Sequence, residues 1–265
     1  MDWLYTCSGF VVGTLVGATG VGGGSLMTPI LVLLFGVSPT TAVGTDLLFA
    51  SITKGFGTAL HGFNRSISWP IVGALCAGSL PAALGTLWLI HDVLDRDAVA
   101  PVIRYALGVA LVVTSCALLV QALRTKRPRA DAEAPANGPS SDEPVFTRRV
   151  VVCTVATGAV LGCLVTLTSV GAGALGVMVL MALFPGIRSV RIVGTDIAHA
   201  VPLTLIAGLG HAGIGGVDFG MLGWLLLGSV PGIAVGTQAS FRLPERAMKQ
   251  LLAALLFVVG AKLVL

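Results

Sequence analysis

Apolar residues occur along most of the chain in runs of about twenty, and short polar stretches separate these runs. An α-helix of that length crosses the hydrocarbon core of a bilayer, so each run predicts a membrane-spanning helix. Six runs have this length: 42–61, 69–90, 101–123, 191–212, 219–241 and 248–265.

Two further apolar stretches, 3–36 and 148–186, are too long for one straight span. Glycine weakens a helix, and non-helical backbone at membrane depth is tolerated only where protein or a cavity surrounds it. Close helix packing through small residues is the alternative explanation. The recurrence of the pattern favours a broken helix in each stretch. The clusters are Gly22, Gly23, Gly24 and Ser25 in the first stretch, and Gly171, Ala172 and Gly173 in the second.

Composition agrees with a polytopic membrane protein. Of the 265 residues, 55% are hydrophobic and 11% are charged, which is more apolar surface than a soluble domain of this size buries. Thirty-five glycines and few aromatic residues favour helices packed through small residues over a β-barrel. The net charge of +4 comes mostly from loop residues, which orient a membrane protein and do not indicate nucleic-acid binding. The lipid bilayer is the expected partner, and the composition is compatible with a homo-oligomer.

A polar segment divides the chain into two transmembrane halves, 1–123 and 148–265. Residues 124–147 are rich in Ala, Pro, Asp, Glu and Ser, a composition that cannot bury enough apolar surface to fold. We therefore expect a disordered linker. Basic clusters flank it on both sides, which places it in the cytoplasm by the positive-inside rule.

The two halves form an internal repeat. Chance matching would not keep one register through Thr, Asp, His and Pro, so we take the duplication as real. Three groups recur at a constant offset of 150 residues: Val43-Gly-Thr-Asp46 with Val193-Gly-Thr-Asp196, His61 with His211, and Gly78-Ser-Leu-Pro81 with Gly228-Ser-Val-Pro231.

Loop charges predict the orientation of the halves. If stretch 148–186 is a hairpin, five basic residues fall on the cytoplasmic side; if it crosses once, all five fall outside. These residues are Arg188, Arg191, Arg242, Arg246 and Lys249. The positive-inside rule selects the hairpin, and both termini are then extracellular.

Five segments in each half, an odd number, predict that the halves are inverted. The expected fold is an all-α polytopic membrane protein with two inverted five-segment repeats, each opening with a broken-helix hairpin. Inverted repeats with broken helices are typical of secondary transporters, which bind their substrate near the membrane midplane.

Several motifs are specific in combination: Gly17 to Ser25 followed by Pro29, Val43 to Asp46, Gly78 to Pro81, and their second-half counterparts. With these motifs the chain resembles the TauE/SafE sulfite-exporter family over its whole length except the linker. The resemblance implies a transporter of sulfite, organosulfonates or related sulfur anions in the bacterial plasma membrane. The second glycine motif departs from the pattern at Ser169 to Ala174, so the two half-sites need not contribute equally.

The glycine clusters are the candidate substrate site. Half-helices that begin near Gly22 to Ser25 and near Gly171 to Gly173 would point unpaired backbone N–H groups and positive dipole ends at the bilayer centre. Thr28 and Thr168 would add hydroxyl donors. A sulfonate is tetrahedral and only accepts hydrogen bonds, so such donors suit a small anionic substrate.

Lys54 is expected deep within its helix. Snorkelling to an interface is one interpretation, because Arg65 lies close to the cytoplasmic end. In the other, Lys54 is a positive group that faces the transport pathway and binds the anion. The equivalent position is Thr204, so this charge is not a symmetric structural requirement.

Asp46 and Asp196 each follow Gly-Thr near the start of a predicted segment. Each is either an N-terminal cap of its own helix or a proton carrier or gate, because acids within transmembrane segments are expensive. His199, one turn after Asp196, is placed to share a proton with it. His61 and His211 end their segments and are interpreted as interfacial polar residues.

No enzyme motif withstands inspection. The glycine stretch has no βαβ context, and there is neither a GxSxG nor a Walker motif, so no cofactor is expected. Two ligands in an Asp-x-x-His pair are too few for a metal site. The sequence therefore predicts a secondary transporter or facilitator that exports a small sulfur-containing anion. A carrier of another small anion or of a metal cation, and a membrane subunit that transports nothing, are the alternatives.

Overall fold

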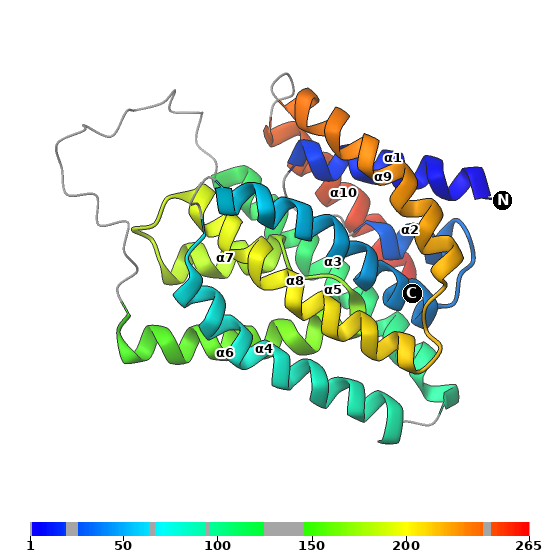
Figure 1. Ribbon diagram of the computed structural model, residues 1–265, viewed down its shortest axis with the longest axis horizontal. Helices are drawn as coiled ribbons and strands as arrows, with labels where there is room; N and C mark the ends of the chain where they lie inside the picture. Colours follow the sequence, from blue (N-terminus) through cyan, green and yellow to red (C-terminus); the bar gives the residue numbers. More distant parts are fainter. Residues whose placement is uncertain are drawn as a thin grey trace.

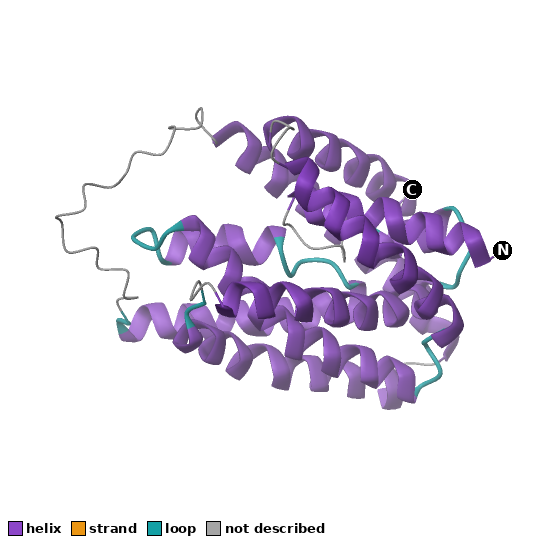
Figure 2. Cartoon of the chain, turned by 45° about the horizontal axis from the view of Figure 1, so that its top comes forward, coloured by secondary structure: helices purple, strands orange, loops and turns teal. Residues whose placement is uncertain are grey.

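The computed structural model describes residues 2–19, 26–63, 67–93, 96–124, 146–240 and 245–264, and in these residues the chain is helical with no strand (Figure 2). The predicted linker falls largely outside them, at 125–145. The first half contains α1 (Asp2–Thr19), α2 (Met27–Leu33), α3 (Pro39–Phe63), α4 (Trp69–Trp88), the π-helical turn η2 (Leu89–Val93) and α5 (Arg96–Arg124). The second half contains α6 (Arg148–Thr168), α7 (Ala174–Leu183), α8 (Ser189–Gly213), α9 (Phe219–Ser240) and α10 (Glu245–Val264).

The prediction of an all-α polytopic membrane fold is confirmed. Each of the six apolar runs is a helix, and five helices within the described residues are long and apolar enough to cross a membrane. Large apolar side chains cover the outside of the helices, and Trp3, Phe56, Val160 and Val258 are each more than 60% exposed. Such a surface suits lipid rather than water.

Helices α3 and α8 lie side by side at the centre of the molecule (Figure 1). Residues 42–51 of α3 are all buried, because other helices surround this part of α3 on every side. These two helices carry the repeated Val-Gly-Thr-Asp motifs, so the motifs lie in the interior at the contact between the halves.

The outer helices pair across the halves, α1 with α9 and α4 with α6 (Figure 1). Glycine permits this close packing. A Cβ atom on Gly78 of α4 would overlap the carbonyl oxygen of Val155 in α6, and one on Gly228 of α9 would overlap that of Thr6 in α1. The two overlaps are counterparts in the repeat, so the Gly-Ser-x-Pro motif marks the crossing point of each outer pair.

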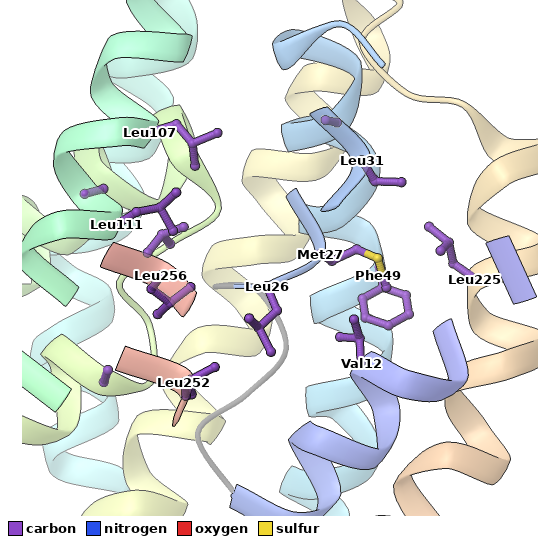
Figure 3. Packing of buried hydrophobic residues seen from close by; sticks show 14 of the residues in the cluster. Val12, Leu26, Met27, Leu31, Phe49, Leu107, Leu111, Leu225, Leu252 and Leu256 are labelled. Atoms are coloured by element: carbon purple, nitrogen blue, oxygen red, sulfur yellow. The ribbon is translucent and has the colours of Figure 1, made fainter. Parts of the chain in front are cut away.

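The largest hydrophobic cluster also joins both halves. Met27 and Leu31 of α2 pack near Phe49 of α3, while Leu107 of α5 and Leu256 of α10 lie in the same cluster (Figure 3). All five side chains are fully buried. The short helix α2 is therefore held by apolar contacts inside the bundle.

The second half opens with two helices separated by a break, and in the first half α1 ends at Thr19 and α2 begins at Met27. The loop after α7 lies on the same side of the molecule as the start of α6, and the two chain termini lie toward the other side (Figure 1). This course of α6 and α7 is that of a hairpin (Figure 1), and the inverted relation of the halves stays a prediction. The orientation in the membrane stays a prediction.

A cysteine introduced at Arg188, in the loop after α7, is expected to resist a membrane-impermeant maleimide added outside intact cells. The reason is the excess of basic residues on that side. A cysteine at Asp92, an exposed residue of η2 on the predicted outer side, is the matched positive control. Both substitutions are made in a background without native cysteines. Labelling at position 188 from outside would contradict the inverted arrangement.

Candidate functional site

The predicted break in the second half is present between α6 and α7. Residues 169–173 are not helical, and Ser169, Gly171 and Gly173 have positive φ angles of 58°, 122° and 130°. Glycine adopts such angles without a steric penalty, which explains two of the three. A continuous packed helix, the alternative for this stretch, is therefore wrong here.

Thr168 holds the break in place. Its hydroxyl donates to the Leu164 carbonyl over 2.7 Å, and the Val170 N–H donates to the same hydroxyl oxygen over 3.1 Å. In the first half, α1 ends at Thr19 and α2 begins at Met27. The prediction for Gly22, Gly23, Gly24 and Ser25 falls outside the described residues.

Lys54 of α3 reaches across to the second break. Its side chain is only 6% exposed, and Nζ donates to the carbonyl oxygen of Ala172 over 3.0 Å. Because Ala172 lies in the break, its carbonyl is available to accept this bond, and Lys54 has a partner at depth. Snorkelling is therefore the wrong interpretation. The Lys54 charge also interacts with the carboxylates of Asp196 and Asp46.

Asp46 is fully buried and binds the first turn of α2. Its Oδ2 accepts from the Thr28 backbone N–H over 3.2 Å and from the Thr28 hydroxyl over 2.5 Å. Because α3 begins at Pro39, Asp46 lies inside that helix, and the prediction of a cap on its own helix is wrong. The carboxylate instead stabilises the N-terminus of a different helix, where a negative charge is favourable.

Asp196 of α8 is the counterpart of Asp46, and its carboxylate lies at the start of α7. Its own helix begins at Ser189, so it is not a cap of α8 either. A Cβ on Gly176 would overlap Oδ1 of Asp196, which places the carboxylate directly against the backbone of α7. The Gly173 N–H approaches the carboxylate, yet neither oxygen has a hydrogen-bond partner of good geometry among the described residues.

His199 pairs with Ser79 of α4 and not with Asp196. The His199 ring is fully buried, and its Nε2 shares a hydrogen bond of 2.9 Å with the Ser79 hydroxyl, while Nδ1 has no partner among the described residues. The expected proton sharing with Asp196 is thus absent from these contacts. Helical spacing put the two residues near one another, but the ring points toward α4.

His211 is likewise buried. Its Nε2 donates to the carbonyl oxygen of Thr166 over 2.9 Å, so the interpretation as an interfacial residue is wrong for this histidine. The neighbouring Gly44 leaves room for it, because a Cβ there would crowd the His211 side chain. The side chain of His61 lies outside the described residues.

Sequence reasoning missed the role of the threonine in each Val-Gly-Thr-Asp motif. The Thr195 hydroxyl accepts from the Ser68 N–H over 2.9 Å, and the Thr45 hydroxyl accepts from the Asp218 N–H over 3.1 Å. Ser68 and Asp218 immediately precede α4 and α9. Each threonine therefore anchors the start of a helix in the opposite half, and the repetition of Thr beside Asp was the available signal.

Thr195→Val is expected to destabilise the protein by about 0.5 to 2 kcal/mol, the usual effect of losing a side-chain partner at a helix start. Thermal unfolding in detergent measures the change. Thr204→Val is the matched control on the same helix, because the Thr204 hydroxyl bonds only to carbonyls of α8 itself. Equal melting temperatures for the two variants would show that the Thr195 contact is not stabilising.

The described residues contain no group of three or more His, Cys, Asp and Glu side chains that could hold a metal ion. The buried polar groups near the second break are instead one ammonium, two carboxylates, two imidazoles and several hydroxyls, contributed by both halves. This arrangement can bind a charged solute and exchange protons with it.

A helical membrane bundle whose two halves meet at buried charges has the architecture of a polytopic membrane transporter. The chain belongs to the sulfite exporter TauE/SafE family, whose model matches residues 5–263. A probable membrane transporter protein of Bacillus subtilis (strain 168), YjnA, is 37% identical over 259 residues, which cover 97% of each chain.

Two further probable membrane transporter proteins of the same organism are similar to the chain. YdhB is 26% identical over 244 residues, which cover 91% of each chain. YunE is 29% identical over 119 residues, or 43% of this chain and 40% of the relative. No solved structure matches the chain. The protein is therefore a multi-pass membrane transporter.

Proposed function

We propose that the protein is a secondary transporter or facilitator that exports a small sulfur-containing anion, sulfite or an organosulfonate, across the bacterial plasma membrane. Family membership supports the sulfur anion, and the Bacillus relatives support the bacterial membrane. The two halves are inverted in this proposal, and the anion binds near the midplane between the two breaks.

The contact between Lys54 and the second break carries the proposal. A buried lysine is costly within a membrane and is usually retained for function. Its ammonium donates a hydrogen bond to the Ala172 carbonyl oxygen. The N–H of the next residue, Gly173, approaches the Asp196 carboxylate at the start of α7. A positive charge beside a helix N-terminus suits a tetrahedral anion that only accepts hydrogen bonds.

The other site residues have different roles in this proposal. Gly22, Gly23, Gly24 and Ser25 form the second half of the anion site by analogy with Gly171, Ala172 and Gly173. The hydroxyls of Thr28 and Thr168 already donate to Asp46 and to the Leu164 carbonyl, so these threonines position α2 and the second break. Asp46, Asp196 and His199 are the proton-carrying or gating residues of this proposal.

Transport into proteoliposomes tests the proposal. Purified protein is expected to give saturable flux of sulfite and of sulfoacetate, which unlabelled organosulfonate inhibits. Sulfate and simple carboxylates serve as competitors of different shape and charge. Carboxylate flux without sulfonate flux would replace the substrate class, flux of a divalent metal would indicate a cation carrier, and the absence of any flux from folded protein would indicate a subunit that transports nothing.

A further inference from the structure

The charged groups at the contact between the halves do not balance. Lys54 contributes one positive charge, and Asp46 and Asp196 can contribute two negative charges, all on side chains that are 6% exposed or less. We infer that Asp196 binds one proton for each anion that the protein carries, so that transport of a monoanion moves no net charge. This inference rests on the proposed anion site.

Asp196 lies where the negative charge of a substrate would be held. Its carboxylate rests against the backbone of α7 at Gly176, near the Gly173 N–H, and interacts with the Lys54 charge. These are the groups assigned to the anion. The carboxylate and the anion therefore compete for one ammonium and for one helix N-terminus.

A proton resolves this competition. If both aspartates are ionised, the three charged groups sum to one negative charge, and an anion would make the sum more negative in a medium that screens poorly. When Asp196 takes up a proton, the anion replaces it as the counter-charge of Lys54. The proton and the anion then cross together and leave together, and no other reactant is needed.

The hydrogen bonds distinguish Asp196 from Asp46. Asp46 accepts two hydrogen bonds from Thr28, which favour its charged form and tie it to α2. Asp196 has no hydrogen-bond partner of good geometry among the described residues. A buried carboxylate without such partners is the group that gains most from protonation.

Few other titratable groups face Asp196. Helix α3 brings Asp46 and Lys54, and helix α8 brings His199, whose Nε2 is shared with Ser79. His211, at the far end of α8, donates to the Thr166 carbonyl. Helix α7 has no titratable side chain, α4 has only Cys76, and α6 has two outward-facing cysteines after its first arginines.

Methanesulfonate is the probe for the experiment, because it stays a monoanion between about pH 5 and about pH 8, where free sulfite changes its charge. Flux into proteoliposomes is measured under a pH gradient and, separately, under a potassium diffusion potential set with valinomycin. The wild-type flux is expected to follow the pH gradient and to ignore the potential. Asp196→Asn is expected to reverse this pattern, because an amide carries no proton and the anion then crosses alone.

Asp46→Asn is the matched variant. It removes the same charge at the equivalent position of the other half and is expected to keep the response to pH while lowering the yield of folded protein. Proton uptake on substrate binding, measured in weakly buffered detergent solution, does not depend on transport. We expect one proton per bound methanesulfonate in the wild type and none in Asp196→Asn.

Each other outcome is decisive. Saturable binding without proton uptake would overturn the inference and leave the proposed anion site standing. Loss of proton uptake in Asp46→Asn, with uptake retained in Asp196→Asn, would overturn the choice of Asp196. If folded wild-type protein neither bound nor transported methanesulfonate, sulfite or sulfoacetate, the proposed function and this inference would both fail.

Discussion

Lys54→Met is expected to weaken anion binding by about 1.5 to 3.5 orders of magnitude while the protein still inserts into the membrane. Methionine keeps the length of the side chain but removes the charge and the bond to the Ala172 carbonyl. Truncating one partner of a buried charged contact costs about 2 to 5 kcal/mol, which corresponds to this loss of affinity. Concentration dependence of flux, together with substrate-induced thermal stabilisation, gives the size of the effect.

Thr204→Val is the control for Lys54→Met. Thr204 occupies the equivalent position in α8 and is also buried, but its hydroxyl bonds within its own helix. Its substitution should leave both the affinity and the flux close to those of the wild type. If Lys54→Met bound the anion as well as this control does, the positive charge would have no part in substrate recognition.

Gly78→Ala is expected to destabilise the protein by about 1 to 3 kcal/mol, because the added methyl group would overlap the Val155 carbonyl oxygen. Helices α4 and α6 would have to separate along their length. Alanine is the better helix former, so local propensity opposes the effect and cannot cause it. The melting temperature in detergent and the fraction of monodisperse protein report the loss.

Gly85→Ala provides the comparison on the same helix. Nothing lies within 4 Å of the Cβ that alanine would add at Gly85, so this substitution is expected to leave the melting temperature unchanged or slightly higher. A Gly78→Ala protein as stable as Gly85→Ala would mean that α4 and α6 do not pack as closely as the contact of Gly78 with Val155 indicates.

The course of the helices could be predicted from the sequence because it follows from local composition. Apolar runs matched to the bilayer thickness predicted the helices. The glycine cluster predicted the break at Gly171 and Gly173, where φ is positive. Loop arginines and the 150-residue repeat also predict which side the loops occupy, and that orientation stays a prediction. Each of these signals can be read along the chain without knowing how the helices cross.

The partners of the buried polar groups could not be predicted in the same way. A cap was one interpretation of Asp46 and Asp196 because they lie near the starts of apolar runs. The helices begin seven residues before each aspartate, and the carboxylates lie against other helices. His199 is one turn from Asp196 but bonds to Ser79. Such contacts depend on how α3, α4 and α8 cross, which a one-dimensional pattern does not contain.

The pairing of outer helices also bears on how the protein is synthesised. The most extensive helix packing joins opposite halves, as in α1 with α9, α4 with α6, and α5 with α10. While the ribosome has completed only the first five helices, α1 and α4 lack the surfaces against which their glycines fit. Until α9 has been inserted, the close-packing faces of the first half must therefore contact lipid or a chaperone.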